Sequence, residues 1–310
     1  MKLHYKRHTD DWVVEECGSQ VLSEEGEHAW FWVEKQLQNS EDVARALAQH
    51  FGVARRDVGY AGRKDKHGIT RQWFSVATPR TDWPELEGVR CLSAHRHRRK
   101  LRTGQLVSNR FDLVVHSDSA LGDDHMHSLW QLNVGFANYF GPQRLSGDNF
   151  EQAVAWLTQR RQRRISQNKR AWHLSVLRSK LFNAVLDQRL REVGLPGVIE
   201  GDVLVHGFPS APLWGRGRTP AQAAALDLER AALAPFAEIC EALEYAGVTQ
   251  GRRAAYVRPQ EFSVTQLDNQ SARLCFRLPA GAYATSLLAS LPYELIDASQ
   301  PRPETVASYG

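Results

Sequence analysis

The chain has 310 residues, of which 42% are hydrophobic and 24% charged, and this composition fits a soluble globular protein of about two domains. Its formal net charge of +4 is too small to identify or exclude a class of partner by itself. The residues from Met1 to Trp12 are charged, and no apolar run is long enough to span a bilayer. We therefore expect no signal peptide, no membrane span and a cytoplasmic protein. Four scattered cysteines without a C-x-x-C pair indicate thiols in a reducing compartment.

Short apolar or alternating runs predict β-strands in the first part of the chain and again near its end. The predicted strands are Val13–Val14, Ala29–Val33, Gln72–Thr78, Phe111–Val115 and Leu274–Leu278. Two connections are also indicated by composition. Gly59–Gly68 is rich in Gly and Lys and predicts a loop, and Pro279–Gly281 predicts a turn.

Helical periodicity is clearest over Ser40–Phe51. Asn39 suits the N-cap position, apolar residues recur at every fourth position, and Gly52 suits the position that follows the last helical residue. Gly207–Pro220 is dense in Gly and Pro and predicts an irregular loop. The further predicted helices are Glu151–Gln159, Leu177–Glu192, Ala221–Tyr245 with a break at Pro235, and Thr285–Leu291.

The order of these elements predicts the fold class. Strands and helices are mixed without a regular βαβ rhythm, which indicates an α+β protein. The middle third of the chain is its most helical part. We therefore expect a strand-rich region built from both ends of the chain, with a helical insertion between them.

Basic residues gather in two runs, His95–Arg102 and Arg160–Arg170. Two such runs, in a chain that also has nine Trp, are compatible with surfaces that bind the phosphates of RNA. Each run is also compatible with a solvated face that binds nothing. The two interpretations stay open on charge alone.

The segment most suggestive of chemistry is the predicted loop Gly59–Gly68, in which Asp65 is surrounded by basic residues and flanked by glycines. Positive neighbours would keep this carboxylate ionised, as a nucleophile or a base requires. The alternative is a surface turn in which Asp65 caps its own loop. The chain has neither a Walker motif nor a dinucleotide fingerprint, so no nucleotide cofactor is predicted.

A metal enzyme is one competing hypothesis. Asp123–His127 contains two carboxylates and an H-x-H pair, which are plausible metal ligands. The segment follows Gly122, is predicted to be a polar loop and has no obvious further ligand nearby. We therefore expect no metal site.

Several motifs together resemble those of the TruD family of tRNA pseudouridine synthases, in the same order and over almost the whole chain. The blocks are Ala61–Asp65 followed by Lys66, Thr70, Gln72 and Trp73; Lys100–Leu106 with Asn109–Phe111; Asn138–Arg144; Arg178–Asn183 with Gly201–Asp202; and Leu278–Thr285. The chain departs from the usual motifs at a few positions, namely Trp12, Ser108, Ala137 and Leu145–Ser146. These departures leave Asp65 in place.

The resemblance implies a pseudouridine-synthase catalytic domain, a mixed and mostly antiparallel sheet with flanking helices, made from 1–140 plus 254–310. Residues 141–253 would form an inserted, helix-rich TRUD domain. The implied activity is that of an isomerase that converts uridine to pseudouridine at position 13 of tRNA, with tRNA-Glu as an expected substrate. No cofactor and no metal are implied. The alternative is a non-catalytic RNA-binding or tRNA-folding protein on the same scaffold.

The resemblance also implies roles for particular residues. Asp65 would be the catalytic carboxylate and Lys6 its basic partner. Asn109 offers a donor and an acceptor to the edge of uracil. Phe111, Trp12 and Tyr283 would stack on the flipped base, although each could instead pack in the core. The candidates for phosphate contact are Lys64, Lys66, Arg98, Arg99, Lys100, Arg163 and Arg164.

Overall fold

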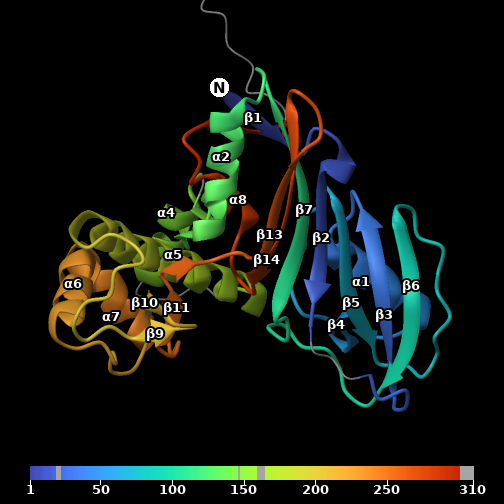
Figure 1. The fold of residues 1–310 in the computed structure, drawn as a ribbon. Helices are drawn as coiled ribbons and strands as arrows, with labels where there is room; N and C mark the ends of the chain where they lie inside the picture. Colours follow the sequence, from blue (N-terminus) through green and yellow to red (C-terminus); the bar gives the residue numbers. More distant parts are fainter. Residues whose placement is uncertain (19–21, 146, 159–164, 301–310) are drawn as a thin grey trace, which may run out of the picture. The chain divides into compact units, whose positions relative to one another are not determined.

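The computed structural model describes residues 1–18, 22–145, 147–158 and 165–300, which fall into two compact units (Figure 1). The first unit comprises Met1–Asn133, Pro259–Gly281 and the residues from Leu291 onward. The second comprises Val134–Arg258 and Ala282–Ser290. The first unit is thus assembled from segments far apart in the sequence. The assignment of 141–253 to a family-specific inserted domain stays a prediction.

A ten-stranded sheet is the framework of the first unit. Its strand order is β13-β14-β7-β2-β5-β3-β6, with β1 beside β7 and β15, and β4 beside β5. The pairs β1–β15 and β2–β5 are parallel and the others are antiparallel. The strands are β1 (Lys2–Tyr5), β2 (Trp12–Cys17), β3 (His28–Gln36), β4 (Val58–Tyr60), β5 (Ile69–Val76), β6 (Val89–His97), β7 (Ser108–Ser117), β13 (Gln260–Gln266), β14 (Ser271–Pro279) and β15 (Glu294–Asp297).

Helix α1 (Ser40–Phe51) covers one face of this sheet, behind β3 and β5 in Figure 1. Its apolar stripe buries Val43 and Leu47 against strand residues such as Phe31. Full burial of side chains of this size contributes about 1.5–3 kcal/mol each. Gly52 follows the helix in the left-handed conformation, at φ 67°, as its position predicts. Both ends of this helix are as the sequence predicts.

The second unit packs helices around a separate apolar core, which includes Leu177, Leu181 and Phe182 of α5. The Oγ of Ser166 caps α5 by accepting a hydrogen bond from Lys169 N at 3.3 Å. The helices are α3 (Pro142–Leu145), α4 (Asn149–Thr158), α5 (Gln167–Glu192), α6 (Ala223–Leu233), α7 (Ala237–Tyr245) and α8 (Ala284–Leu288). The strands are β8 (Phe136–Ala137), β9 (Leu204–Val205), β10 (Phe208–Leu213), β11 (Gly251–Ala254) and β12 (Tyr256–Val257).

The predicted α+β class, with a mixed and mostly antiparallel sheet, is confirmed. The predicted loop over Gly207–Pro220 is wrong in its first half, because β10 pairs there with β9 and β11. A proline cannot donate to a ladder, yet its carbonyl can still accept. The carbonyl of Pro209 accepts from Ala255 N at 2.8 Å, so the strand forms despite its prolines. The predicted loop Gly59–Gly68 likewise begins within β4.

The polar segment Asp123–His127 is not a loop but the start of helix α2 (Asp123–Gln131). Asp123 and Asp124 occupy its first turn, where negative side chains interact favourably with the helix dipole. Leu129 is the buried residue of this helix, so the apolar repeat that usually reveals a helix is too weak to predict it.

Candidate active site

Asp65 lies in the loop that joins β4 to β5. Its Oδ2 accepts hydrogen bonds from Lys6 Nζ at 3.3 Å and from Trp12 Nε1 at 3.1 Å. The Asp65 side chain is 43% exposed, whereas that of Lys6 is 6% exposed. A carboxylate held in this way has a fixed direction and can still be reached by a ligand.

Lys6 follows β1 directly and has a left-handed backbone at φ 59°. For a residue with a Cβ this conformation is sparsely populated, and strained residues of this kind cluster at functional sites. Lys6 Nζ also lies 4.4 Å from the centroid of the Trp12 ring. The ammonium is therefore held between a carboxylate and an aromatic face. The structure brings together Lys6, Trp12 and Asp65, three residues that the sequence analysis had assigned to one site.

Gly68 fixes the distance between the end of this loop and β2. It has φ 139°, and a Cβ at this position would lie 2.4 Å from the carbonyl oxygen of Trp12. Only glycine permits both this backbone conformation and this approach. The loop that carries Asp65 is thus seated directly on the residue that donates to its carboxylate.

Lys35, on β3, is a residue of this site that the sequence analysis missed. Its side chain is buried, with the residue 1% exposed, and its Nζ donates to the main-chain oxygens of Asp65 and Gln38, both at 2.8 Å. Burial lowers the pKa of Lys35 to about 8, although the negative charge of Asp65 opposes the shift. A signal existed in the sequence, because Lys35 continues the alternation of Phe31 and Val33 on the face that packs against α1.

Asn109 and Glu16 lie opposite each other where β2 pairs with β7. Lys64 Nζ donates to Asn109 Oδ1 and lies 3.9 Å from Glu16 Oε2. The Lys64 side chain is 4% exposed, and burial lowers its pKa, with the carboxylate of Glu16 opposing the shift. The structure therefore places Asn109 beside the loop of Asp65, with Lys64 turned inward. The proposed contacts of Asn109 with uracil and of Lys64 with phosphate remain predictions.

The three aromatic candidates lie in different surroundings. Phe111 is buried on β7 and stacks on Phe276 of β14, with ring centroids 5.2 Å apart. Trp12 is buried, and its N–H is directed at Asp65. Tyr283 belongs to the second unit, where its ring lies 6.4 Å from that of Phe140. Stacking of these residues on a nucleobase remains a prediction.

A cavity of about 530 Å³ adjoins the Lys6–Asp65 pair within the first unit. Lys6 forms part of its wall, as do the two residues that end the Asp65 loop, His67 and Gly68. Arg7 and His8 add further basic groups, and Asp10 adds one carboxylate. The wall around Lys6, the partner of Asp65, is thus polar and rich in basic side chains.

The comparison with known proteins identifies the family. Residues 2–149 match the family model of tRNA pseudouridine synthase D (TruD). The tRNA pseudouridine synthase D of Aeromonas salmonicida is 37% identical over 90% of this chain and 87% of its own length. That of Cellvibrio japonicus is 38% identical over 90% of this chain and 85% of its own length. The chain belongs to the tRNA pseudouridine synthase D family.

Family membership confirms the resemblance that the sequence motifs indicated. The fold agrees as well. A crystal structure from Methanosarcina mazei, described as a tRNA pseudouridine synthase D, superposes with a TM-score of 0.63 over 96% of this chain and 94% of that one, at 17% identity. At this identity the likeness supports the fold alone.

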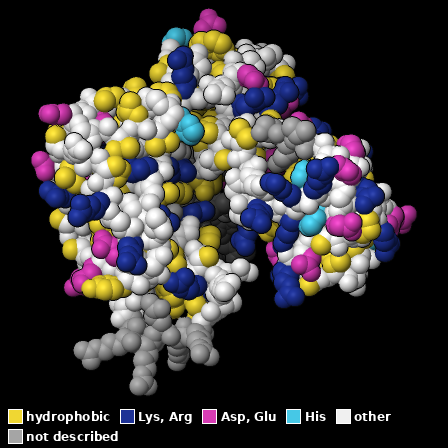
Figure 2. Space-filling model, turned by 90° about the horizontal axis from the view of Figure 1, so that it is seen from below, with side chains coloured by type: hydrophobic (Ala, Val, Ile, Leu, Met, Phe, Trp, Pro, Cys, Tyr) yellow, Lys and Arg dark blue, Asp and Glu magenta, His cyan; other side chains and the backbone are white. Residues whose placement is uncertain are grey.

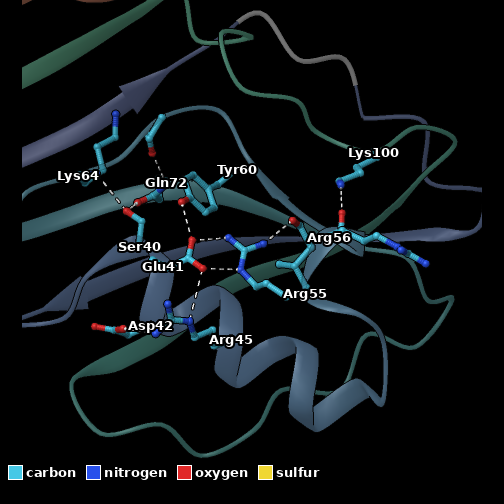
Figure 3. A network of polar contacts seen from close by, with 12 residues as sticks. Ser40, Glu41, Asp42, Arg45, Arg55, Arg56, Tyr60, Lys64, Gln72 and Lys100 are labelled. Atoms are coloured by element: carbon cyan, nitrogen blue, oxygen red, sulfur yellow. Dashed lines mark hydrogen bonds and ion pairs between the residues drawn. The ribbon is translucent and has the colours of Figure 1, made fainter. Parts of the chain in front are cut away.

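Three of the basic residues proposed to contact phosphate, those that directly follow β6, lie outside the Lys6–Asp65 site. Arg98 forms an ion pair with Glu25, and Lys100 Nζ donates to the main-chain oxygen of Arg56 (Figure 3). The carbonyl of Arg99 accepts from Trp30 Nε1 at 2.8 Å. Lys66 is exposed in the Asp65 loop. Arg163 and Arg164 lie outside the described residues.

The surface charge in the described part of the chain is mixed. On the face drawn in Figure 2, dark-blue Lys and Arg side chains lie beside magenta Asp and Glu side chains as well as beside His. Phosphate binding by the run at His95–Arg102 therefore remains a prediction, with a partly paired solvated face as the alternative.

The residues that the structure describes contain no group of three or more His, Cys, Asp or Glu side chains arranged to hold a metal ion. The Asp123–His127 segment lies on α2. None of the helices in the described residues combines the length and hydropathy that crossing a bilayer requires.

The buried ammonium of Lys35 predicts a specific pH dependence of stability. Between about pH 8 and 10.5 the folded protein has released this proton while the unfolded chain still binds it. The free energy of unfolding therefore rises with pH in this window, by on the order of 3 kcal/mol. Lys35→Met lacks this titrating group. We therefore expect the unfolding free energy of wild type minus that of Lys35→Met, measured by urea titration, to increase by that amount from pH 8 to pH 10.5. A difference that stays constant with pH would contradict the assignment.

Proposed function

We propose that this protein is a tRNA pseudouridine synthase, an isomerase that converts uridine to pseudouridine in tRNA. The proposed site is position 13, with tRNA-Glu among the substrates. Asp65 is the essential carboxylate. The observation that carries the proposal is the geometry of Asp65, which is half-exposed and held by Lys6 and Trp12, in a chain of this family.

The reaction agrees with what the site offers. Formation of pseudouridine breaks the bond between C1′ and N1, turns the uracil and joins C1′ to C5. N1 gains a proton and C5 loses one. The nucleoside therefore keeps its overall oxidation state, and the reaction requires no redox cofactor. Asp65 supplies the ionised oxygen needed for attack at C1′, addition at C6 or removal of a sugar proton. Lys6 pairs with the negative charge of Asp65 before that oxygen forms its bond to carbon or to a proton.

The cavity beside Lys6 supports binding of an extruded nucleotide. An enzyme that acts on a base must first take it out of its stack. The volume of about 530 Å³ lies within the roughly 300–1,000 Å³ that is usual for small-ligand pockets. Arg7, His8 and His67 would contact the phosphates that flank the uridine.

Mapping of pseudouridine tests the proposal. Purified protein is incubated with unmodified tRNA-Glu transcript, and pseudouridine is then located by reverse transcription after carbodiimide treatment. We expect stoichiometric modification at position 13 and none in a transcript with cytidine at that position. Binding of tRNA without any pseudouridine would instead support the non-catalytic RNA-binding alternative, and modification elsewhere would overturn the assigned position.

A further inference from the structure

Three buried polar side chains from the sheet and α1 contact the main chain of the Asp65 loop. They are Lys35 on β3, Ser40 at the start of α1 and Gln72 on β5, and they are 1%, 2% and 0% exposed. Buried polar groups are costly unless they are hydrogen-bonded, so their partners indicate what they stabilise. In each case one partner is a peptide group of the same short loop.

Ser40 and Gln72 form a connected pair, as Figure 3 shows. Ser40 Oγ donates to Gln72 Oε1 at 2.6 Å and accepts from the main-chain N–H of Lys64 at 3.0 Å. Gln72 Nε2 donates to the carbonyl oxygen of Gly62 at 3.0 Å. The pair thus holds two peptide groups just before Asp65.

Lys35 holds the loop at Asp65 itself. Its Nζ donates to the main-chain oxygen of Asp65 at 2.8 Å and to the main-chain oxygen of Gln38 at the same distance. Both acceptors are neutral carbonyl groups, which compensate a buried ammonium less well than a carboxylate would. This arrangement is costly as a means of stabilising the fold, yet it fixes the peptide whose side chain is the candidate catalytic group.

We propose that Lys35, Ser40 and Gln72, here called the loop clamp, are positioning residues that fix the direction of the Asp65 carboxylate. The inference rests on the proposed function of Asp65. The loop clamp holds the backbone at residues 62, 64 and 65, while Lys6 and Trp12 hold the side chain. All three clamp residues belong to the sheet and α1 of the first unit, so the loop takes its position from regular secondary structure.

Accurate placement of a reacting group strongly affects rate, since a misplacement of about 1 Å lowers it about 10²-fold. We therefore expect Ser40→Ala to lower the single-turnover rate of pseudouridine formation about 10- to 100-fold, with the Kd for tRNA within about threefold of wild type. Ser40→Thr retains the hydroxyl and should restore most of the rate. Rates are measured with saturating enzyme, well below the unfolding temperature of each variant.

Ser117→Ala is the matched control. Ser117 is a buried serine on β7 whose Oγ also accepts a main-chain N–H, that of Ser119 at 3.1 Å, but it contacts no residue of the Asp65 loop in the described structure. The same chemical change there should leave the rate within about twofold of wild type. Equal losses of rate in Ser40→Ala and Ser117→Ala would show that Ser40 stabilises the fold without positioning Asp65, and would overturn the proposal.

Hydrogen exchange tests the contact independently of activity. In Ser40→Ala we expect the Lys64 amide to exchange at least about tenfold faster, because its acceptor is gone. Unchanged exchange of the Lys64 amide would overturn the loop clamp. Faster exchange with an unchanged rate of pseudouridine formation would overturn it as well. Both outcomes would leave the proposed function intact. A wild-type protein that makes no pseudouridine would remove the proposed function and the positioning role with it, even if the exchange result is as expected.

Discussion

Asp65→Asn is expected to lower the single-turnover rate of pseudouridine formation about 10³-fold or more, to a residual rate that long incubations can measure. The amide is nearly the same size as the carboxylate and can still contact Lys6 and Trp12, but it lacks the negative charge that the chemistry requires. The affinity for tRNA should change by no more than a few-fold. The measurements are product mapping on tRNA and a filter-binding titration of the same preparation.

Asp82→Asn is the matched control for this substitution. Asp82 is exposed in the first unit and pairs with Arg80 and His50, away from the Asp65 loop. Activity retained in Asp65→Asn would remove Asp65 from the mechanism. A loss of folding in Asp65→Asn, seen as a lowered Tm that Asp82→Asn does not share, would instead indicate a structural carboxylate.

Lys6→Met is expected to lower the rate about 10²-fold with little change in tRNA affinity. The methionine keeps much of the length of the side chain and can pack on Trp12, so the main loss is the positive charge 3.3 Å from Asp65. Lys6→Arg should recover part of the rate because it retains a cation. Single-turnover rates of the three proteins provide the comparison.

The double variant makes this prediction sharper. If Lys6 acts through the charge on Asp65, then Lys6→Met should cause no further loss of rate in an Asp65→Asn background. An undiminished loss there would show that Lys6 acts on the substrate independently of Asp65. A full rate in the single variant would exclude it from the site.

The parts of the fold that the sequence predicts are those with strong local signals. The bounds of α1 follow from an apolar repeat and from Gly52, which stops the helix in the left-handed conformation. By contrast, β10 contains two prolines and α2 has a single buried residue. Their formation depends on contacts with other elements of the fold, which no local sequence pattern predicts. The parallel pairing of β2 with β5, which brings Trp12 to the Asp65 loop, is also non-local.

The same distinction applies to the site. The local sequence indicates Asp65 as a carboxylate in a Gly-rich basic segment. Its pairing with Lys6 follows from the family motifs alone, because nothing in the local sequence indicates a contact between residues 59 positions apart. Lys35 was visible as a lysine on a core-facing position and was overlooked. Lys64, a candidate for phosphate contact, has a buried side chain in the structure, because a charge in a Gly-rich segment does not indicate which way the loop turns.

The close approach at Gly68 limits how this loop can vary. A side chain there would force the loop away from the Trp12 carbonyl and so separate the two segments that meet at the carboxylate. The main chain at the exposed neighbours Lys66 and His67 is not in the left-handed conformation and so is under no such restriction. The tolerance of the loop to mutation is therefore set by main-chain geometry as much as by charge.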